Sequence, residues 1–493
     1  QRDGIIVPDL PTIDTSTEQD VAGGGYNHWA TAGFFGRLNY NYKEKYLLEV
    51  NGRYDGTSRF MKDQRWNFFP SFSLGWNVAR ENFWKPLESV VNQFKLRGSW
   101  GELGNQNTSN LYPFYEILPV KSNSGNWLVN GGKTNTADIP SLVSTLLTWE
   151  RVRSFNVGFD FGAFSNRLTG SFDYFVRKTV DMVGPAPQLP LVLGIAPAIV
   201  NNADMKSYGF EIELSWRDRI GEVDYGVKFN LADAQQKVVK YPNTTNAFSD
   251  WYAGKMSGEI WGYTSLGIAK TDEEMKEHLA SLPNGGQNQL GNKWGAGDIM
   301  YADINGDGKI DGGKGTLADP GDQRIIGNST PRYNFGLVLD ASYKGFDVSI
   351  FFQGVGKRDY APIVGTNGAV FWGAVNNIWQ SMAMEEHFDY FRPEGHPMGA
   401  NLNGYYPRPD FTSNKNHQVQ TRYLQDASYI RLKNLQIGYT LPKQWINKLH
   451  INRCRVYVSG DNLWTGTSLA SMFDPETLAA GDWGSGKTYP LSK

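Results

Sequence analysis

The sequence predicts an all-β fold: a transmembrane antiparallel β-barrel with long extracellular loops. Three observations predict it. Apolar and polar residues alternate along many segments, and the apolar side is unusually rich in aromatic residues. About 12 such segments of roughly 9–15 residues occur, the length that a tilted strand needs to cross a bilayer. The connections between them alternate between short and long, as in outer-membrane barrels.

Composition excludes several other classes of protein. The 493 residues include 48 basic and 50 acidic ones, so the net charge of −2 offers no excess of cations for nucleic acid. No run of about 20 apolar residues is present, which excludes a helical membrane protein. A single cysteine, Cys454, excludes a disulfide scaffold. The 16 Trp, 25 Tyr, 27 Phe and 55 Gly favour strands and loops.

Alternation with a period of two places each strand. In the first segment, Phe34, Leu38 and Tyr40 share one side, and Arg37 and Asn39 share the other. The same pattern predicts strands at 34–42, 46–55, 71–78, 94–100, 155–161, 168–177, 210–217, 225–231, 333–343, 346–352, 430–439 and 454–461. Near the end, Ile430 and Leu432 are out of phase with Leu435 and Ile437, which predicts a β-bulge.

The connections distinguish a barrel from a soluble sandwich or propeller, whose strands also alternate but are mostly about 5–6 residues long. Short connections are expected at 42–45, 162–167, 217–223, 343–346 and 442–451, and a small helical element at 80–91. Long loops are expected at 56–64, 105–147, 179–206, 237–330, 355–424 and from 464 onward. In a barrel of this kind the aromatic face meets outer-membrane lipid and the polar face lines a lumen.

The direction of the strands then divides the chain into three parts. Residues 1–27 are expected to be an extracellular loop segment, 28–463 the membrane strands with their loops, and 464–493 an extracellular loop before a missing final strand. The first strand runs into a short turn, so further strands are expected before Gln1 and at least one after Lys493. No signal peptide precedes the first segment.

Several stretches together carry a family resemblance: GRYDGTSRF (52–60), FPSFSLGWNVARE (69–81), LRGSWGELGNQ (96–106), LTWE (147–150), GDIMYADINGDGKID (297–311), YKGFDVSIFFQGVG (343–356), YIRLKNLQIGYTLP (429–442) and RVYVSGDNLWT (455–465). In this order they resemble the SusC/RagA family of TonB-dependent outer-membrane transporters.

The resemblance implies a 22-stranded barrel with an N-terminal plug in the outer membrane of a Gram-negative bacterium. It also implies a SusD-like surface lipoprotein as lid, and TonB-driven import of oligosaccharides or peptides, with a dimer of such pairs as a possible assembly. The plug, the TonB box and the last strand are absent from this sequence, which therefore resembles the C-terminal half or more of the barrel.

One loop motif has the spacing of a calcium site. Asp303, Asn305, Asp307, Lys309 and Asp311 follow positions 1, 3, 5, 7 and 9 of an EF-hand-type loop, where alternating oxygens wrap one Ca²⁺. Position 12 is Lys314 instead of a bidentate Glu, and Asp319 or Asp322 is a candidate for the missing carboxylate. A structural Ca²⁺ is expected here; the alternative is a polar hairpin with Asx turns.

A second motif, Gly481 to Thr488, matches the Walker A pattern, but a proline at 490 and the absence of a preceding strand favour a glycine-rich loop over nucleotide binding. Aromatic residues in the predicted loops form a third group. Such rings stack on sugars or peptide side chains, or pack loops together. The candidates for substrate contact are Trp127, Trp251, Tyr252, Trp261, Trp294, Phe371, Trp372, Trp379 and Trp483.

No catalytic motif is present, and the six histidines are dispersed, so the protein is expected not to be an enzyme. The expected function is TonB-dependent import of an oligosaccharide or peptide with a SusD-like lid. The alternatives are a passive porin or a calcium-dependent surface adhesin, and a secreted β-protein that binds carbohydrate.

Overall fold

The computed structural model describes residues 26–478 apart from 109, 187–189, 191, 193, 196, 363–369, 374–383, 411–414 and 448–450. The Walker A-like stretch lies outside these residues, as do Trp379 and Trp483. Among the described residues, no helix has the length and apolar character needed to traverse a membrane.

One antiparallel sheet of twelve strands dominates the structure, and each strand pairs only with its neighbours along the chain. Its strands are β1 (Thr31–Tyr42), β2 (Tyr46–Thr57), β3 (Trp66–Asn77), β4 (Val91–Asn105), β9 (Glu150–Ala163), β10 (Leu168–Val183), β11 (Asn201–Ile220), β12 (Val223–Lys240), β17 (Arg332–Tyr343), β18 (Phe346–Lys357), β21 (Tyr429–Thr440) and β22 (Arg455–Thr467). Each contains one of the predicted segments or overlaps it closely, so the predicted strand set is confirmed.

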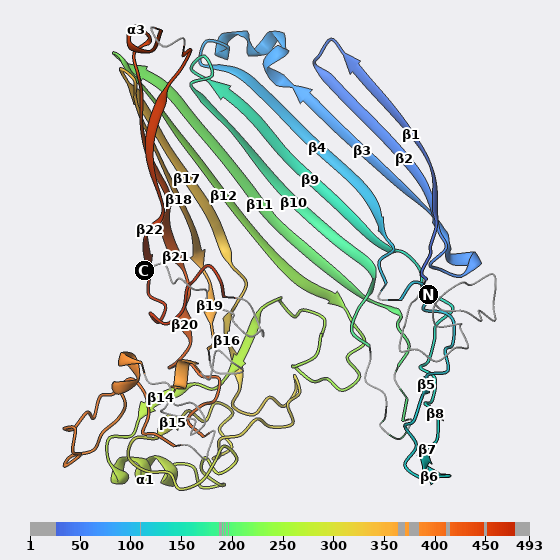
Figure 1. The fold of residues 1–493 in the computed structure, drawn as a ribbon, viewed down its shortest axis with the longest axis vertical. Helices are drawn as coiled ribbons and strands as arrows, with labels where there is room; N and C mark the ends of the chain where they lie inside the picture. Colours follow the sequence, from blue (N-terminus) through green and yellow to red (C-terminus); the bar gives the residue numbers. More distant parts are fainter. Residues whose placement is uncertain are drawn as a thin grey trace.

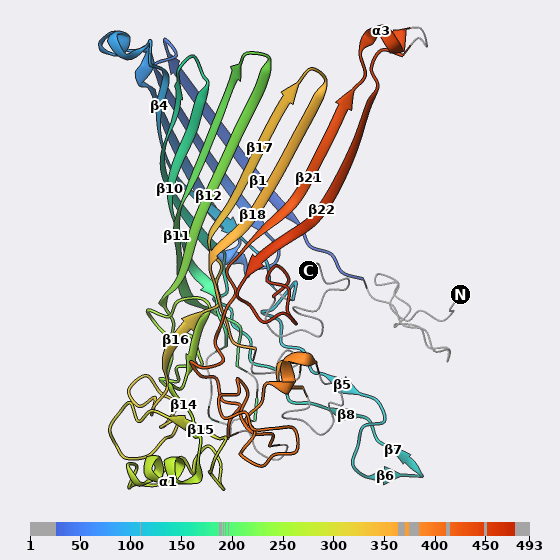
Figure 2. The same cartoon turned by 90° about the vertical axis from the view of Figure 1, so that its left-hand side faces the viewer.

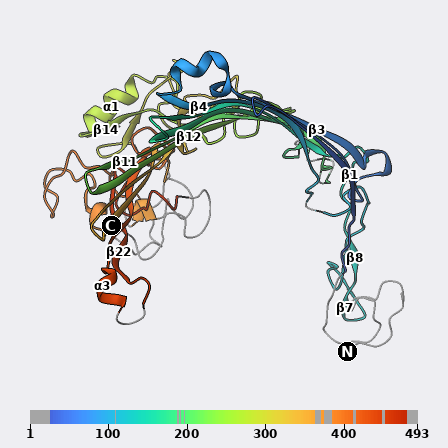
Figure 3. The ribbon, with the colours of Figure 1, turned by 90° about the horizontal axis from the view of Figure 1, so that it is seen from above.

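The sheet is tilted and curved into an arc whose ends are β1 and β22 (Figure 1; Figure 3). No second sheet is stacked on it, which excludes the sandwich alternative for the described residues. The short turns gather at one end of the strands and the long loops at the other (Figure 2). The fold is therefore the wall of a large antiparallel barrel that the described residues leave open.

The end with short turns contains four tight hairpins, which join β1 to β2, β9 to β10, β11 to β12 and β17 to β18, and three short helical segments in the other two connections. Lys43, Glu44 and Lys344 have positive φ, as hairpin turns with the twist of the flanking strands require. The element expected at 80–91 consists of the 3₁₀ helices η3 (Val78–Arg80) and η4 (Asn82–Leu87), and α3 (Lys443–Ile446) lies in the last short connection.

The predicted bulge is present in β21. Phe352 pairs with Leu432 and Phe351 with Asn434, so Lys433 is left without a partner in β18, and the pairing of β21 with β22 is also irregular at Lys433. The long-loop ends of β10, β11 and β12 differ from the prediction: β10 continues to Val183 and β11 begins at Asn201, so the connection expected at 179–206 is shorter.

The long loops contain small pairs of their own. The β4–β9 loop holds β5 (Val120–Lys121) with β8 (Thr136–Ala137), and β6 (Leu128–Val129) with β7 (Gly132–Lys133). The other pairs are β13 (Glu259–Gly262) with β16 (Arg324–Asn328), β14 (Ser265–Ile268) with β15 (Ile299–Tyr301), and β19 (Asp359–Tyr360) with β20 (Gln425–Asp426). Short helices are η2 (Lys62–Gln64), η7 (Glu385–Phe388) and α1 (Asp272–Ala280). Thr271 caps α1 by accepting the Glu274 N–H.

Candidate functional site

The two faces of the sheet differ in chemistry. On one face, aromatic rings stack across strands: Tyr54 lies 5.1 Å from Trp66, Phe72 lies 6.0 Å from Trp100, and Phe159 lies 5.6 Å from Phe172. Residues at the alternate positions carry charges and amides. The segregation that the sequence predicts is therefore present across the sheet, and a sheet of this kind can separate an apolar from an aqueous environment.

Ion pairs cross the strands on the polar face. The Arg97 guanidinium bonds Asp160 at 2.8 Å and Asp173 at 2.8 Å, and so joins β4, β9 and β10. Near the long-loop end of the opposite face, at the alternation of Trp100 and Phe155, Arg153 bonds Glu102 at 2.9 Å. Toward the other edge, Arg455 pairs with Asp347 across β21. Arg97 and Arg455 on the polar face thus each have carboxylate partners that fix their position.

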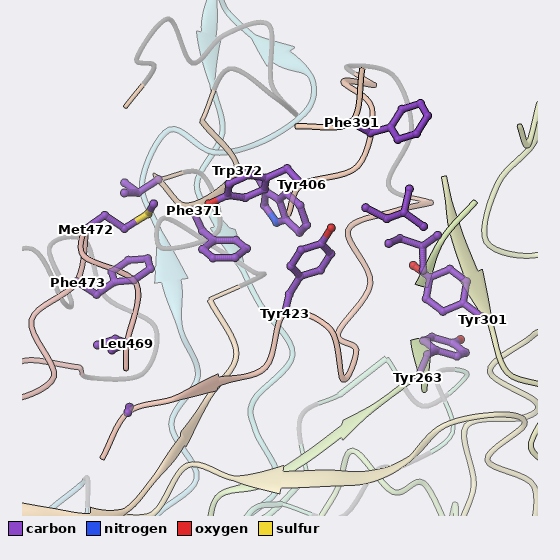
Figure 4. Close-up of a cluster of buried hydrophobic side chains, with 14 of the residues drawn as sticks. Tyr263, Tyr301, Phe371, Trp372, Phe391, Tyr406, Tyr423, Leu469, Met472 and Phe473 are labelled. Carbon is purple, nitrogen blue, oxygen red and sulfur yellow. The ribbon is translucent and has the colours of Figure 1, made fainter. Parts of the chain in front are cut away.

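The long loops after β12, β18 and β22 fold together into one unit, which we call the loop body: the described residues of 241–331, 358–428 and 468–478. Its core contains Phe371, Trp372, Tyr406 and Tyr423, none more than 2% exposed. Figure 4 shows these four rings together, with Phe473 to one side and Tyr301 to the other. Three connections that are distant in sequence therefore share one hydrophobic core.

A buried polar network holds the loop body together around Asp298, which has no exposed surface. Its carboxylate accepts hydrogen bonds from Arg408 Nε at 2.9 Å, from Lys415 Nζ at 2.9 Å and from Asn416 Nδ2 at 2.9 Å. Asn416 in turn accepts the Ile299 N–H at 3.0 Å. These bonds join residues more than 100 positions apart and fix one arrangement of the loops.

The segment after β22 is attached to the sheet by a second cluster of charges. Arg431, only 2% exposed, donates to Asp474 at 2.8 Å and to Glu476, while Lys433 donates to Glu476 at 2.8 Å. Phe473 enters the hydrophobic core of the loop body. The segment 468–478 therefore links the edge of the sheet to the loop body.

The aromatic candidates for substrate contact lie in different environments. Trp127 is exposed on the arm formed by β5 to β8. Trp251, Tyr252 and Trp261 are half-buried, and the Trp261 ring stacks on Phe248 at 4.6 Å. Trp294 packs against the core of the loop body, with the Lys415 amine 5.1 Å from its ring centroid.

Two of the candidates, Phe371 and Trp372, are buried in that core, at 0% and 1% exposure. In this conformation their rings stabilise the loops against one another, which is the alternative that the sequence left open. The structure does not gather those aromatic candidates that it describes into one surface.

The calcium-type loop is closed by its own side chains. Asp303 accepts the N–H groups of Gly306 at 2.7 Å and Gly308 at 2.8 Å. Asp322, which is fully buried, accepts those of Ile304 at 2.8 Å and Asp311 at 2.9 Å. The bonds of Asp303 are local, of the Asx type that also orders an EF-hand loop, whereas Asp322 closes the loop from 11 and 18 residues further along the chain.

Lys309 places its amine between carboxylates of the same loop. Nζ bonds Asp311 and lies 3.8 Å from Asp307, and this ammonium holds the pKa of Asp311 below its usual value. Burial raises the pKa of Asp322. The described residues contain no group of three or more His, Cys, Asp or Glu side chains positioned to hold a metal ion. Calcium binding by Asp303, Asn305, Asp307, Lys309 and Asp311 stays a prediction.

A two-faced antiparallel sheet with short turns at one end and folded loops at the other defines the wall of an outer-membrane β-barrel. Residues 4–463 match the family model described as TonB dependent receptor-like, beta-barrel. The chain belongs to this family.

Named relatives and solved structures agree with this membership. The chain is 31% identical over 460 residues to TonB-dependent receptor P3 of Formosa agariphila, covering 90% of this chain and 41% of that protein. It is 25% identical over 427 residues to TonB-dependent receptor SusC of Bacteroides thetaiotaomicron, covering 84% and 38%. A structure of the RagAB peptide transporter superposes with a TM-score of 0.67 at 22% identity, covering 89% and 44%.

The resemblance to SusC and RagA drawn from the sequence motifs is thereby confirmed. The chain spans about two fifths of the length of the relatives that it matches. The family is one of transporters and receptors rather than enzymes.

Proposed function

We propose that this chain is part of a transporter that imports an oligosaccharide or peptide across the outer membrane of a Gram-negative bacterium, driven by TonB. The observation that carries the proposal is the sheet itself: its aromatic face suits acyl chains, and its polar face suits an aqueous lumen. Membership of the TonB-dependent receptor family supports the energy source.

We further propose that a SusD-like lipoprotein covers the long-loop end. The loop body supports this, because a cofolded core and a buried ion network give a rigid platform for a second protein. The likeness to the SusC receptor and to the fold of the RagAB transporter supports the same partnership, and with it a dimer of such pairs. Outer-membrane lipid surrounds the strands in this arrangement.

The test is uptake by the full-length protein in its own host. Growth on the transported nutrient is expected to stop when either this protein or TonB is removed. Uptake that continues without TonB would instead indicate a passive porin, and surface attachment without uptake an adhesin. Detergent dependence is a separate check, since a monodisperse protein in plain buffer contradicts a membrane barrel.

A further inference from the structure

A polar cavity of about 190 Å³ lies where β12, β17 and β18 meet the loop body. Gln236, Arg332 and Lys357 line it from the long-loop ends of these strands, and Ser257, Asn328 and Thr330 line it from the loops. By alternation, Gln236 shares a face with Lys228 and Asn230, and Lys357 with Asp347 and Gln353. Gln235, at the opposite alternation of β12, also lines the cavity, which therefore lies at the rim of the sheet, at its long-loop end.

The loop wall of the cavity is fixed by internal bonds. The Ser257 carbonyl accepts Asn328 Nδ2 at 2.9 Å and Thr330 Oγ1 at 2.8 Å. The neighbouring Gly258 has φ of +82°, and a Cβ there would lie 2.5 Å from Thr330 Oγ1. The wall thus has its shape before any ligand enters, which lowers the entropy cost of binding.

Hydrogen-bond donors are in excess inside the cavity. Ser257 Oγ donates to Gln236 Oε1 at 3.1 Å, which leaves the amide hydrogens of Gln236 for another acceptor. Arg332 uses Nε and Nη2 to bond Asp233, and its charge is thereby neutralised. Lys357 differs, because among the described residues no carboxylate lies within ion-pair distance of its amine.

The nearby carboxylates already have partners. Asp359 accepts the Asn328 N–H at 2.8 Å, and Glu259 accepts the Met256 N–H at 2.7 Å and the Tyr252 hydroxyl. None of the described residues that line the cavity is acidic. The cavity therefore carries a net positive charge from Lys357, surrounded by amides and hydroxyls.

We propose that this cavity is a subsite for an acidic oligosaccharide, in which Lys357 binds a carboxylate or sulfate of the sugar. The inference rests on the proposed import function and adds its substrate class. Amide and hydroxyl walls complement the hydroxyl groups of a sugar, whereas a peptide needs apolar pockets for its side chains, and Met256 is the single apolar residue described in the lining. Gln236 donates to the same oxyanion or to a ring hydroxyl.

The experiment uses the full-length transporter in detergent on an array of neutral, uronate-containing and sulfated oligosaccharides of equal length, together with acidic peptides. The variants are Lys357→Gln, Lys357→Arg and the control Lys276→Gln, which removes the same charge from the exposed side of α1. We expect acidic oligosaccharides to bind, and Lys357→Gln to weaken that binding about tenfold, as loss of a charge-assisted bond does. Lys357→Arg and the control are expected to bind as wild type. The uronate and sulfate arms identify which oxyanion the site takes.

Two results contradict the proposed subsite. In the first, the wild-type transporter binds neutral glycans or peptides but no acidic glycan. In the second, the wild type and Lys357→Gln bind acidic glycans equally well. Uptake assays separate this failure from failure of the proposed function. If uptake depends on TonB but Lys357→Gln binds acidic glycans like the wild type, the subsite is wrong and the import function stands. Uptake by the wild type that does not need TonB removes the import function.

Discussion

The Asp298→Asn substitution tests whether the loop body is held by its buried ion network. The asparagine amide has the same shape but lacks the negative charge that faces Arg408 and Lys415. It also replaces one carboxylate oxygen, a hydrogen-bond acceptor, by an NH₂ group, which is a donor and faces the donors of these two residues. Removing one partner of a buried ion pair costs about 3–5 kcal/mol. Asp410 lies 3.7 Å from Lys415 and compensates in part, so we expect a loss of about 3 kcal/mol, or roughly 100-fold in the opening equilibrium.

Native-state hydrogen exchange on the full-length protein in detergent measures this loss directly. The amides to follow are Ile299 and Tyr301, which donate to Asn416 and Gln287 inside the network. Their protection is expected to fall about 100-fold, while amides of β9 stay unchanged. Glu273→Gln, at an exposed position of α1, is the matched control and is expected to change stability by less than about 0.5 kcal/mol. Wild-type exchange at Ile299 and Tyr301 in Asp298→Asn would refute the reasoning.

Three further predictions concern the loops. Asp303→Ala is expected to lower the free energy of unfolding of the loop body by about 2 kcal/mol even without calcium, because two N–H groups lose their acceptor. Calcium is expected to raise the Tm of the wild type but not of this variant, and an unchanged wild-type Tm would remove the metal hypothesis. Gly258→Ala is expected to destabilise the loop that follows β12 by about 1–3 kcal/mol, because the new Cβ would contact Thr330 at a residue with left-handed φ. The rate of proteolysis near residue 258 measures this loss. Gly306→Ala is the control for the backbone strain alone, because Gly306 also has positive φ but has open space around its Cβ position. Lys309 lowers the pKa of Asp311, so this ion pair stabilises the fold at pH values above the ordinary pKa of an aspartate. The stabilisation is lost as the pH falls from that value through the lowered pKa of Asp311. In Lys309→Met the Tm is therefore expected to fall less steeply at acid pH than in the wild type, and an equally steep fall contradicts the assignment.

The strands could be predicted because a membrane wall imposes alternation on every residue that crosses it. The bulge at Lys433 could be predicted from the sequence for the same reason, because one extra residue shifts the alternation of all the residues that follow it in the strand. The ends of β10 and β11 were not visible. There the pairing continues past two register shifts, with Met182 opposite Ala203 and Val183 opposite Asn201, and such shifts break the period-two pattern in the sequence.

The loops show where prediction from sequence ends. Phe371 and Trp372 look like exposed recognition residues because polar and glycine-rich sequence surrounds them, but Tyr406 and Tyr423 bury them from more than 30 residues away. Asp298, Lys415 and Asn416 also belong to separate segments, and no spacing rule connects them. The pairing of Arg431 and Lys433 with Asp474 and Glu476 carries a faint signal, namely two cations and two anions each at i, i+2 spacing.

Strict neighbour pairing also bears on how the sheet is assembled. Each strand pairs with the next strand of the sheet along the chain, so the two strands of each hairpin are also close in sequence. Two residues join β11 to β12 but 91 join β12 to β17, a difference of roughly 3 kcal/mol in closure entropy for flexible chains. The bond from the Ser329 N–H to the Gly258 carbonyl, at 2.8 Å, shortens that path. If the long connection folds first, it brings its two flanking strands together at little further entropic cost, so its folding sets the order in which that half of the wall grows.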